Sequence, residues 1–273
     1  MRFRYLLFDL DGTLTDPKEG ITASVQYALR SFGIEEPDLD RLTPFIGPPL
    51  KDSFMEMYGF NEKQAEEAIE KYREWFRPTG IFQNAIYPGI REMLEKLKMQ
   101  GKVLAVASSK PQVFVEQILH HFEIYDYFTV IVGSELDGKR GTKEEVVEEA
   151  LRQLSEVEGQ KKPMEEKGKA EEIDAEAGDS MQSRDSMQSR DGMQSRDVIK
   201  GTDRVGNGHQ ADGRQVAGTV MIGDRKFDVS GGKEYGLVTV GITFGYAPEG
   251  ELEMAGPDYL VDSVEELGRL LAE

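Results

Sequence analysis

Short apolar runs alternate with helix-like segments along most of this chain. The clearest runs are residues 3–9, 103–107 and 219–222, and weaker strand signals lie at 129–132, 238–242 and 259–261. Helical patterns separate them, at residues 89–100, 111–122, 142–154, 228–235 and 263–272. Short apolar strands that alternate with helices predict an α/β fold with a parallel sheet covered by helices.

Residues 17–83 have a different pattern, because they contain only helical signals. In Glu62–Phe76 the apolar residues recur at the spacing of one helix face. Residues 45–50 (FIGPPL) contain two prolines, which break a helix, so we expect a loop there. We therefore predict that 17–83 is a small helical cap domain, inserted into an α/β core made of residues 1–16 and 84–273.

Residues 155–217 form a low-complexity insertion within that core. They are rich in Glu, Lys, Gly, Ser, Gln and Asp, and they repeat SMQSRD at 180–185 and 186–191 and GMQSRD at 192–197. Roughly 2–6 residues normally connect a helix to the next strand of such a sheet, far fewer than here. The composition predicts disorder. The alternative is a segment that folds on a protein partner, which the sequence does not identify.

Composition and charge narrow the classes of partner. The chain has 273 residues, a formal charge of −18 and no cysteine, which excludes disulfides and thiolate chemistry. So acidic a protein repels nucleic acid polymers and anionic membrane surfaces. No run has the length of a transmembrane helix, and the apolar run before Asp9 is too short for a signal peptide. We expect a cytoplasmic protein.

Polar residues gather at or near the predicted strand ends. In chain order they are Asp9 and Asp11, then Ser108, Ser109 and Lys110, then Lys143, then Asp224 and Asp228. Asp9 and Asp11 are two positions apart, so on a strand they share one face. Ligands of open parallel sheets bind outside the carboxyl ends of the strands. All four groups can converge there.

These residue types suit phosphoryl transfer. A cluster of carboxylates is tolerable around a hard cation with oxygen ligands, and Mg²⁺ fits that description. One aspartate can attack phosphorus, and a neighbouring carboxyl can protonate the leaving oxygen and later deprotonate water. A serine hydroxyl, a lysine ammonium and backbone N–H groups would bind the other phosphate oxygens.

In this order and context, FDLDGTLTD, SSK, a lysine and GDRKFD resemble the motifs of the haloacid dehalogenase-like (HAD) hydrolases. The resemblance is to their phosphoglycolate phosphatase and 5′-nucleotidase-like branch, and GITASVQYAL, FIGPPL, YPGI and ITFGYAPEGEL are closest to the 5′-nucleotidase-like members. It implies a Rossmann-like sheet with a helical cap. It also implies a Mg²⁺-dependent phosphatase that hydrolyses a small phosphate monoester, such as a nucleoside 5′-monophosphate or phosphoglycolate, through an aspartyl-phosphate.

The resemblance also implies roles for individual residues. Asp9 would be the nucleophile and Asp11 the general acid/base. Ser108 and Lys143 would bind the phosphoryl group, with Ser109 as the alternative serine. Asp224 would hold Mg²⁺ together with Asp9 and the backbone carbonyl of Asp11, and Asp228 would support the metal or Lys143. The long insertion, and Gly232 where the family often has alanine, depart from the pattern.

Several alternatives stay open at this point. Lys51 could reach from the cap to the far end of the substrate, or it could be an ordinary surface lysine. Lys110 and Arg225 could assist electrostatically, or each could mark an exposed helix start. A phosphomutase on the same fold would share the same motifs, and a binding or scaffold protein would use the 155–217 insertion instead.

Overall fold

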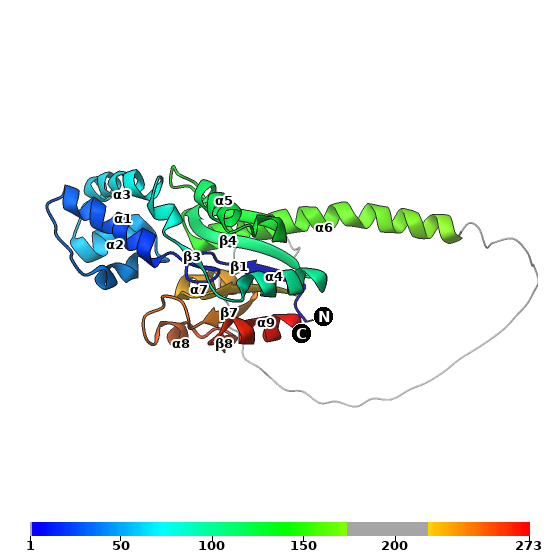
Figure 1. Cartoon of the computed structure of the whole chain (residues 1–273). Coiled ribbons are helices and arrows are strands. Elements are labelled where there is room, and N and C mark those ends of the chain that lie inside the picture. Colours follow the sequence, from blue (N-terminus) through cyan, green and yellow to red (C-terminus); the bar gives the residue numbers. More distant parts are fainter. Residues whose placement is uncertain (1, 174–217) are drawn as a thin grey trace, which may run out of the picture. The chain divides into compact units, whose positions relative to one another are not determined.

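The structure is a computed structural model that describes the backbone of residues 2–173 and 218–273 and the side chains of 2–159 and 218–273. Residues 1–155 and 215–273 form one compact unit, and residues 156–214 belong to a second. The first unit contains both the main sheet and the helices of residues 17–83 (Figure 1).

Six parallel strands form the main sheet, in the order β5-β4-β1-β6-β7-β8. The strands are β1 (Tyr5–Phe8), β4 (Val103–Pro111), β5 (Phe128–Ser134), β6 (Thr219–Gly223), β7 (Val238–Ile242) and β8 (Tyr259–Val261). Every residue of β1 and β6 is buried, which is why these strands read as unbroken apolar runs. The predicted α/β class and all six predicted strands are confirmed.

Helices alternate with these strands along the chain. They are α4 (Ile90–Met99), α5 (Gln112–His121), α6 (Lys143–Ile173), α7 (Lys226–Glu234), α8 (Glu251–Ala255) and α9 (Val264–Ala272), with a 3₁₀ turn η3 at Tyr125–Tyr127. Contacts join α5 to β4 and β5, α7 to β6 and β7, and α4 to α9. Helix α4 buries Ile90, Met93, Leu94 and Leu97, the i, i+3, i+4, i+7 stripe of an amphipathic helix.

Helix α6 is longer than the sequence pattern predicts. We expected a helix over 142–154 and disorder from residue 155, but α6 continues to Ile173. Residues 156–173 are rich in glutamate and lysine, which have high helix propensity, so the longer helix has a local cause. The rest of the insertion, residues 174–217, lies outside the described residues, and its disorder stays a prediction.

Residues 17–83 contain helical elements and no strand. These are α1 (Lys18–Ser31), η1 (Leu39–Phe45), α2 (Leu50–Tyr58), α3 (Glu62–Phe76) and η2 (Gly80–Phe82). Helix α3 begins at a capping box, in which the Asn61 side chain accepts from the Gln64 amide and the Gln64 side chain accepts from the Asn61 amide. Residues 46–49 connect η1 to α2, in the stretch where the two prolines predicted a loop.

A second, two-stranded sheet closes the base of this helical segment. Strands β2 (Thr15–Asp16) and β3 (Ala85–Ile86) pair antiparallel, with Asp16 opposite Ala85. They lie where the chain leaves the main sheet and where it returns. Two-residue strands carry no readable alternation, so the sequence did not predict them.

Among the helices that the structure describes, none combines the length and the apolar character needed to cross a membrane.

Candidate active site

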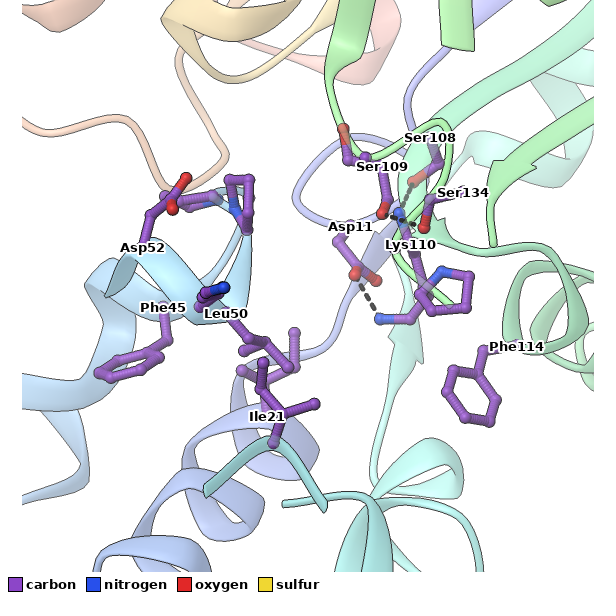
Figure 2. Close-up of a pocket in the computed structure, with 18 of the residues that line it drawn as sticks. Asp11, Ile21, Phe45, Leu50, Asp52, Ser108, Ser109, Lys110, Phe114 and Ser134 are labelled. Carbon is purple, nitrogen blue, oxygen red and sulfur yellow. Dashed lines mark hydrogen bonds and ion pairs between the residues drawn. The ribbon is translucent and has the colours of Figure 1, made fainter. Parts of the chain in front are cut away.

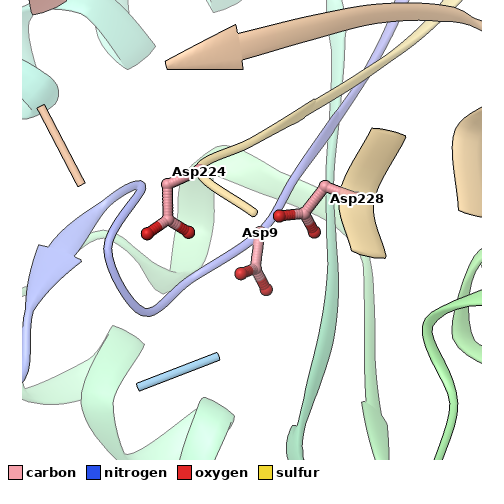
Figure 3. A group of neighbouring side chains, drawn as sticks. All are labelled: Asp9, Asp224 and Asp228. Atoms are coloured by element: carbon pink, nitrogen blue, oxygen red, sulfur yellow. The ribbon is translucent and has the colours of Figure 1, made fainter. Parts of the chain in front are cut away.

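Three carboxylates meet at the carboxyl ends of β1 and β6. Asp9 follows β1, Asp224 follows β6, and Asp228 lies in the first turn of α7 (Figure 3). The two strands are neighbours with Phe8 opposite Ile222, so the residues that follow them emerge side by side. Each residue offers a carboxylate oxygen, and these oxygens lie within 4.8 Å of one another. All three residues are buried.

Lys143, the first residue of α6, joins two of these carboxylates. Its Nζ lies 2.8 Å from Asp9 Oδ1 and 2.7 Å from Asp228 Oδ1, and it donates to the Ala107 carbonyl at 3.0 Å. Burial lowers the pKa of Lys143, but the carboxylates of Asp228 and Asp9 outweigh burial and raise it above its usual value. The ammonium therefore stays charged beside the carboxylate predicted to attack.

Asp11 stands apart from the three-carboxylate cluster. Its Oδ2 forms a buried ion pair with Lys110 Nζ, which Figure 2 shows as a dashed line. The same Nζ lies 4.9 Å from the ring centroid of Phe76, at the end of α3. Burial raises the pKa of the Asp11 carboxyl, and the Lys110 ammonium only partly opposes that rise. A raised pKa suits a carboxyl that must first give a proton and later take one.

Glycines allow the chain to pack tightly around Asp224. Gly12 has φ +79°, and a Cβ there would lie 2.2 Å from Asp224 Oδ2. A Cβ on Gly245 would lie 2.3 Å from Asp224 Cβ. The next amide, Tyr246 N–H, donates to Asp224 Oδ2 at 2.7 Å. These contacts fix the carboxylate in one place.

The cluster has the donor set of a cation site. Asp224 Oδ1 is buried and has no hydrogen-bond partner among the described residues. Burial raises the pKa of Asp224 well above its usual value, and the nearby Asp228 and Asp9 carboxylates raise it further. A hard cation would satisfy that oxygen and relieve the repulsion, so the residues present fit Mg²⁺.

The two predicted serines lie in β4, which continues to Pro111 instead of ending at residue 107. The extension is possible because Pro111 pairs with Ser134 of β5 after a register shift. Ser108 and Ser109 both line the cavity described below, and Ser108 is 2% exposed. The Ser109 carbonyl accepts from Ser134 Oγ at 2.7 Å, which anchors the backbone of this strand end (Figure 2).

A cavity of about 390 Å³ joins these residues to the helices of residues 17–83. Asp9, Asp11, Ser108, Ser109 and Lys143 lie on its floor. The opposite side is lined by three charged residues, Lys51, Asp52 and Arg73, and by a larger group of mostly apolar residues. We call this larger group the cap wall; it comprises Ile21, Phe45, Gly47, Pro48, Pro49, Leu50, Ile69, Tyr72 and Phe76. Asp224 and Asp228 lie outside the lining, behind Asp9.

Lys51 lines the cavity as predicted, but glutamates already surround it. Its Nζ lies 3.2 Å from Glu66 Oε1 and 3.5 Å from Glu62 Oε2, and its side chain is 38% exposed. Both readings of Lys51 are thus compatible with its position. Arg73, which the sequence did not single out, also lines the cavity and pairs with Glu70 at 2.6 Å. Nothing in a charged helical pattern distinguishes it.

Neither Lys110 nor Arg225 is an exposed helix start. Lys110 is buried against Asp11, and Arg225 is 5% exposed and pairs with Glu251. Glu251 was missed as well, because it begins the short helix α8, where the sequence pattern predicted no element.

Comparisons with known proteins agree with this geometry. A family model described as haloacid dehalogenase-like hydrolase matches residues 6–163, and one described as HAD-hydrolase-like matches 202–267. A 5′-nucleotidase of Pseudomonas aeruginosa is 37% identical over 271 residues, which cover 99% of this chain and 96% of that protein. A phosphoglycolate phosphatase of Aquifex aeolicus is 33% identical over half of this chain and 63% of its own length. The crystal structure of a predicted phosphatase from Clostridium acetobutylicum has a TM-score of 0.75 and 39% identity, and the match covers 98% of each chain.

Proposed function

We propose a substrate class and a chemical route for this chain, which belongs to the haloacid dehalogenase-like hydrolases and is a phosphatase of that family. The proposed reaction is Mg²⁺-dependent hydrolysis of a nucleoside 5′-monophosphate to the nucleoside and phosphate. The observation that carries it is a single cavity that joins the Asp9–Asp11 floor to a largely apolar wall.

In the proposed first step, a carboxylate oxygen of Asp9 attacks phosphorus and the bond from phosphorus to the ester oxygen breaks. The Asp11 carboxyl gives its proton to the leaving oxygen, and the nucleoside departs. In the second step Asp11 takes a proton from water, whose oxygen attacks phosphorus while the Asp9–phosphorus bond breaks. The burial that raises the pKa of Asp11 supports both roles.

Other residues bind the phosphoryl group and the metal. Lys143 Nζ would stabilise the phosphoryl oxygens, since it stands 2.8 Å from the attacking carboxylate, and Ser108 or Ser109 would donate from the end of β4. Asp9, Asp224 and the backbone carbonyl of Asp11 would hold Mg²⁺. Asp228 would support the site through Lys143 and sits close enough to act as a further ligand. When bound, the ion shields the negative nucleophile from the negative phosphate.

The cap wall supports a nucleoside over a small acid as the leaving group. Pockets for drug-sized ligands have volumes of about 300–1,000 Å³, and 390 Å³ falls in that range. Ile69, Tyr72 and Phe76 would offer apolar and aromatic surface to a base.

The charges in the cavity also favour a nucleoside over a small acid as the leaving group. Each of the four cations that line it, Lys51, Arg73, Lys110 and Lys143, is already in an ion pair with a carboxylate. The carboxylate of phosphoglycolate would have to compete with those partners, whereas a neutral base and ribose would not. Phosphoglycolate therefore becomes the second candidate, supported by the Aquifex relative.

The test is phosphate release from a panel of nucleoside monophosphates, phosphoglycolate and hexose phosphates, with and without Mg²⁺. We expect metal-dependent release that is fastest with a nucleoside monophosphate. Faster release from phosphoglycolate would overturn the substrate assignment. Conversion of a hexose phosphate to its isomer, without free phosphate, would instead indicate a mutase.

A further inference from the structure

Arg225 lies between the metal-site loop and residues 46–49, which we name the cap loop. We propose that Arg225 is a positioning residue that holds the cap loop, and with it part of the cap wall, against the substrate. This inference rests on the proposed function for its substrate, but its structural part can be tested without turnover.

Glu251 holds the Arg225 side chain on the side away from the cap loop. Its Nε donates to Glu251 Oε1 at 2.8 Å and its Nη2 donates to Glu251 Oε2 at 3.2 Å, a two-pronged contact made inside the protein. Lys226 N–H also donates to Glu251 Oε1, at 3.0 Å, so the carboxylate is itself held by backbone. Such fork-to-fork pairing fixes the plane of the guanidinium as well as its charge.

The remaining prong of Arg225 reaches the cap loop. Its Nη1 donates to the carbonyl of Ile46. The next residue, Gly47, has φ +102°, and a Cβ there would lie 2.8 Å from Arg225 Cγ and 3.0 Å from Nη1. The loop therefore approaches Arg225 so closely that only glycine fits, in a conformation that glycine alone adopts readily.

This contact bears directly on the cavity. Gly47, Pro48 and Pro49 all line it, and Leu50, the first residue of α2, lines it next. The two prolines have fixed φ, so the loop has few soft dihedrals between Ile46 and Leu50. Holding the Ile46 carbonyl therefore places the whole segment.

The role of the Arg225 side chain is separable from the metal site. Arg225 is absent from the cavity lining, so it does not contact substrate there. Its amide donates to Asp228 Oδ2 at 3.0 Å, while burial raises the pKa of Asp224 and the Arg225 guanidinium charge lowers it. A side-chain substitution leaves the amide in place, and Arg225→Lys keeps the charge, so the two variants separate loop positioning from the electrostatics of the metal site.

The experiment compares Arg225→Gln with the wild-type protein on two substrates. One is AMP, which has a large leaving group, and the other is acetyl phosphate, whose leaving group is too small to reach the cap loop. Loss of a charge-assisted hydrogen bond predicts a KM for AMP that rises roughly tenfold, with kcat/KM for acetyl phosphate unchanged. Arg225→Lys keeps the charge but not the fork, so it should restore only part of the lost affinity.

Hydrogen exchange measured by mass spectrometry tests the positioning itself, because it needs no substrate. Peptides that cover residues 45–58 should exchange faster in Arg225→Gln. The matched control is Lys226→Gln, which removes an exposed neighbouring cation and should leave both exchange and KM unchanged. Gly47→Ala disturbs the same contact from the side of the cap loop, because its Cβ would clash with Arg225. It should raise the KM for AMP in the same way. This variant keeps the inference testable if Arg225→Gln does not fold.

Two results would overturn the inference. Equal losses on AMP and acetyl phosphate would place the effect of Arg225 at the metal site. Unchanged exchange and unchanged KM would mean that the cap loop holds its position alone. If the wild-type protein hydrolyses neither substrate, the proposed function fails, and the exchange comparison still decides whether Arg225 positions the loop.

Discussion

The floor of the cavity and the cap wall are built in different ways. The floor comes from the start of α6 and from residues at strand ends, where the neighbouring strands β1 and β4 bring their side chains to one place. The cap wall comes from side chains scattered over α1, η1, the cap loop, α2 and α3. Under the proposed function, the floor would carry the chemistry and the cap wall would select the leaving group. Chemistry and selectivity would then depend on separate sets of residues, and substitutions should separate them.

The largest expected effect is at the floor. Asp9→Asn removes the nucleophile while it keeps the shape of the side chain, so we expect turnover to fall by about 10⁴-fold or more for every substrate. A phosphate-release assay measures this, and acid-quenched protein should lose any covalent phosphoryl adduct seen by mass spectrometry. Retained turnover on even one substrate would show that the floor is not the reaction centre.

Metal removal should be nearly as severe and reversible. Chelation of divalent cations should abolish turnover on all substrates, and added Mg²⁺ should restore it, because the three buried carboxylates otherwise repel one another. Asp224→Asn should raise the Mg²⁺ concentration needed for half-maximal rate. Full activity after exhaustive chelation would show that the reaction does not need a divalent cation, and the proposed metal site would be wrong.

At the cap wall we expect a selective effect. Ile69→Ala opens the wall without touching the floor, so KM for AMP should rise several-fold, in line with the loss of roughly 1–2 kcal/mol of apolar contact. Turnover of acetyl phosphate should not change. Met57→Ala is the matched control, since Met57 lies on α2, is 41% exposed and is outside the cavity lining. Equal effects of both variants would contradict the division between floor and wall.

The smallest effect should lie on the surface of α6, away from both regions. Hydrogen bonds from Arg152 hold the pKa of Glu149 at about 2, below its usual 4.5. The depressed pKa means that the pair stabilises the fold above about pH 4.5 and that this contribution is lost as the pH falls toward 2. The Arg152 side chain is 53% exposed, so the pair contributes at most about 1 kcal/mol.

Glu149→Gln should therefore unfold at slightly lower denaturant concentration at pH 7, and its difference from the wild-type protein should shrink between pH 4.5 and pH 3. Its kcat should not change at any pH. A difference that grows on acidification would have the wrong sign for this ion pair.

The contrast between floor and wall also explains what the sequence could predict. Asp9 and Asp224 were found because strand ends meet by topology, and Lys143 because it starts a helix beside them. Arg73 was not singled out, because an i,i+3 pair with Glu70 is ordinary on a charged helix. For Arg225 the sequence left two alternatives open, because its partner Glu251 is set by tertiary packing that leaves no periodic trace. Helix α6 extends beyond its predicted end. The glutamates and lysines of this stretch favour a helix, while its low-complexity composition is typical of disorder, and composition alone does not show which tendency is stronger.

The paired strands β2 and β3 have a consequence for how such a gene can change. Asp16 and Ala85 stand opposite each other, so the residues between them enter and leave through one point of the chain. DNA added to or removed from that interval would leave every pairing of the six-stranded sheet in register. Under the proposed function, new leaving-group specificities would then arise in this interval while the residues at the ends of β1, β4 and β6 stay in place.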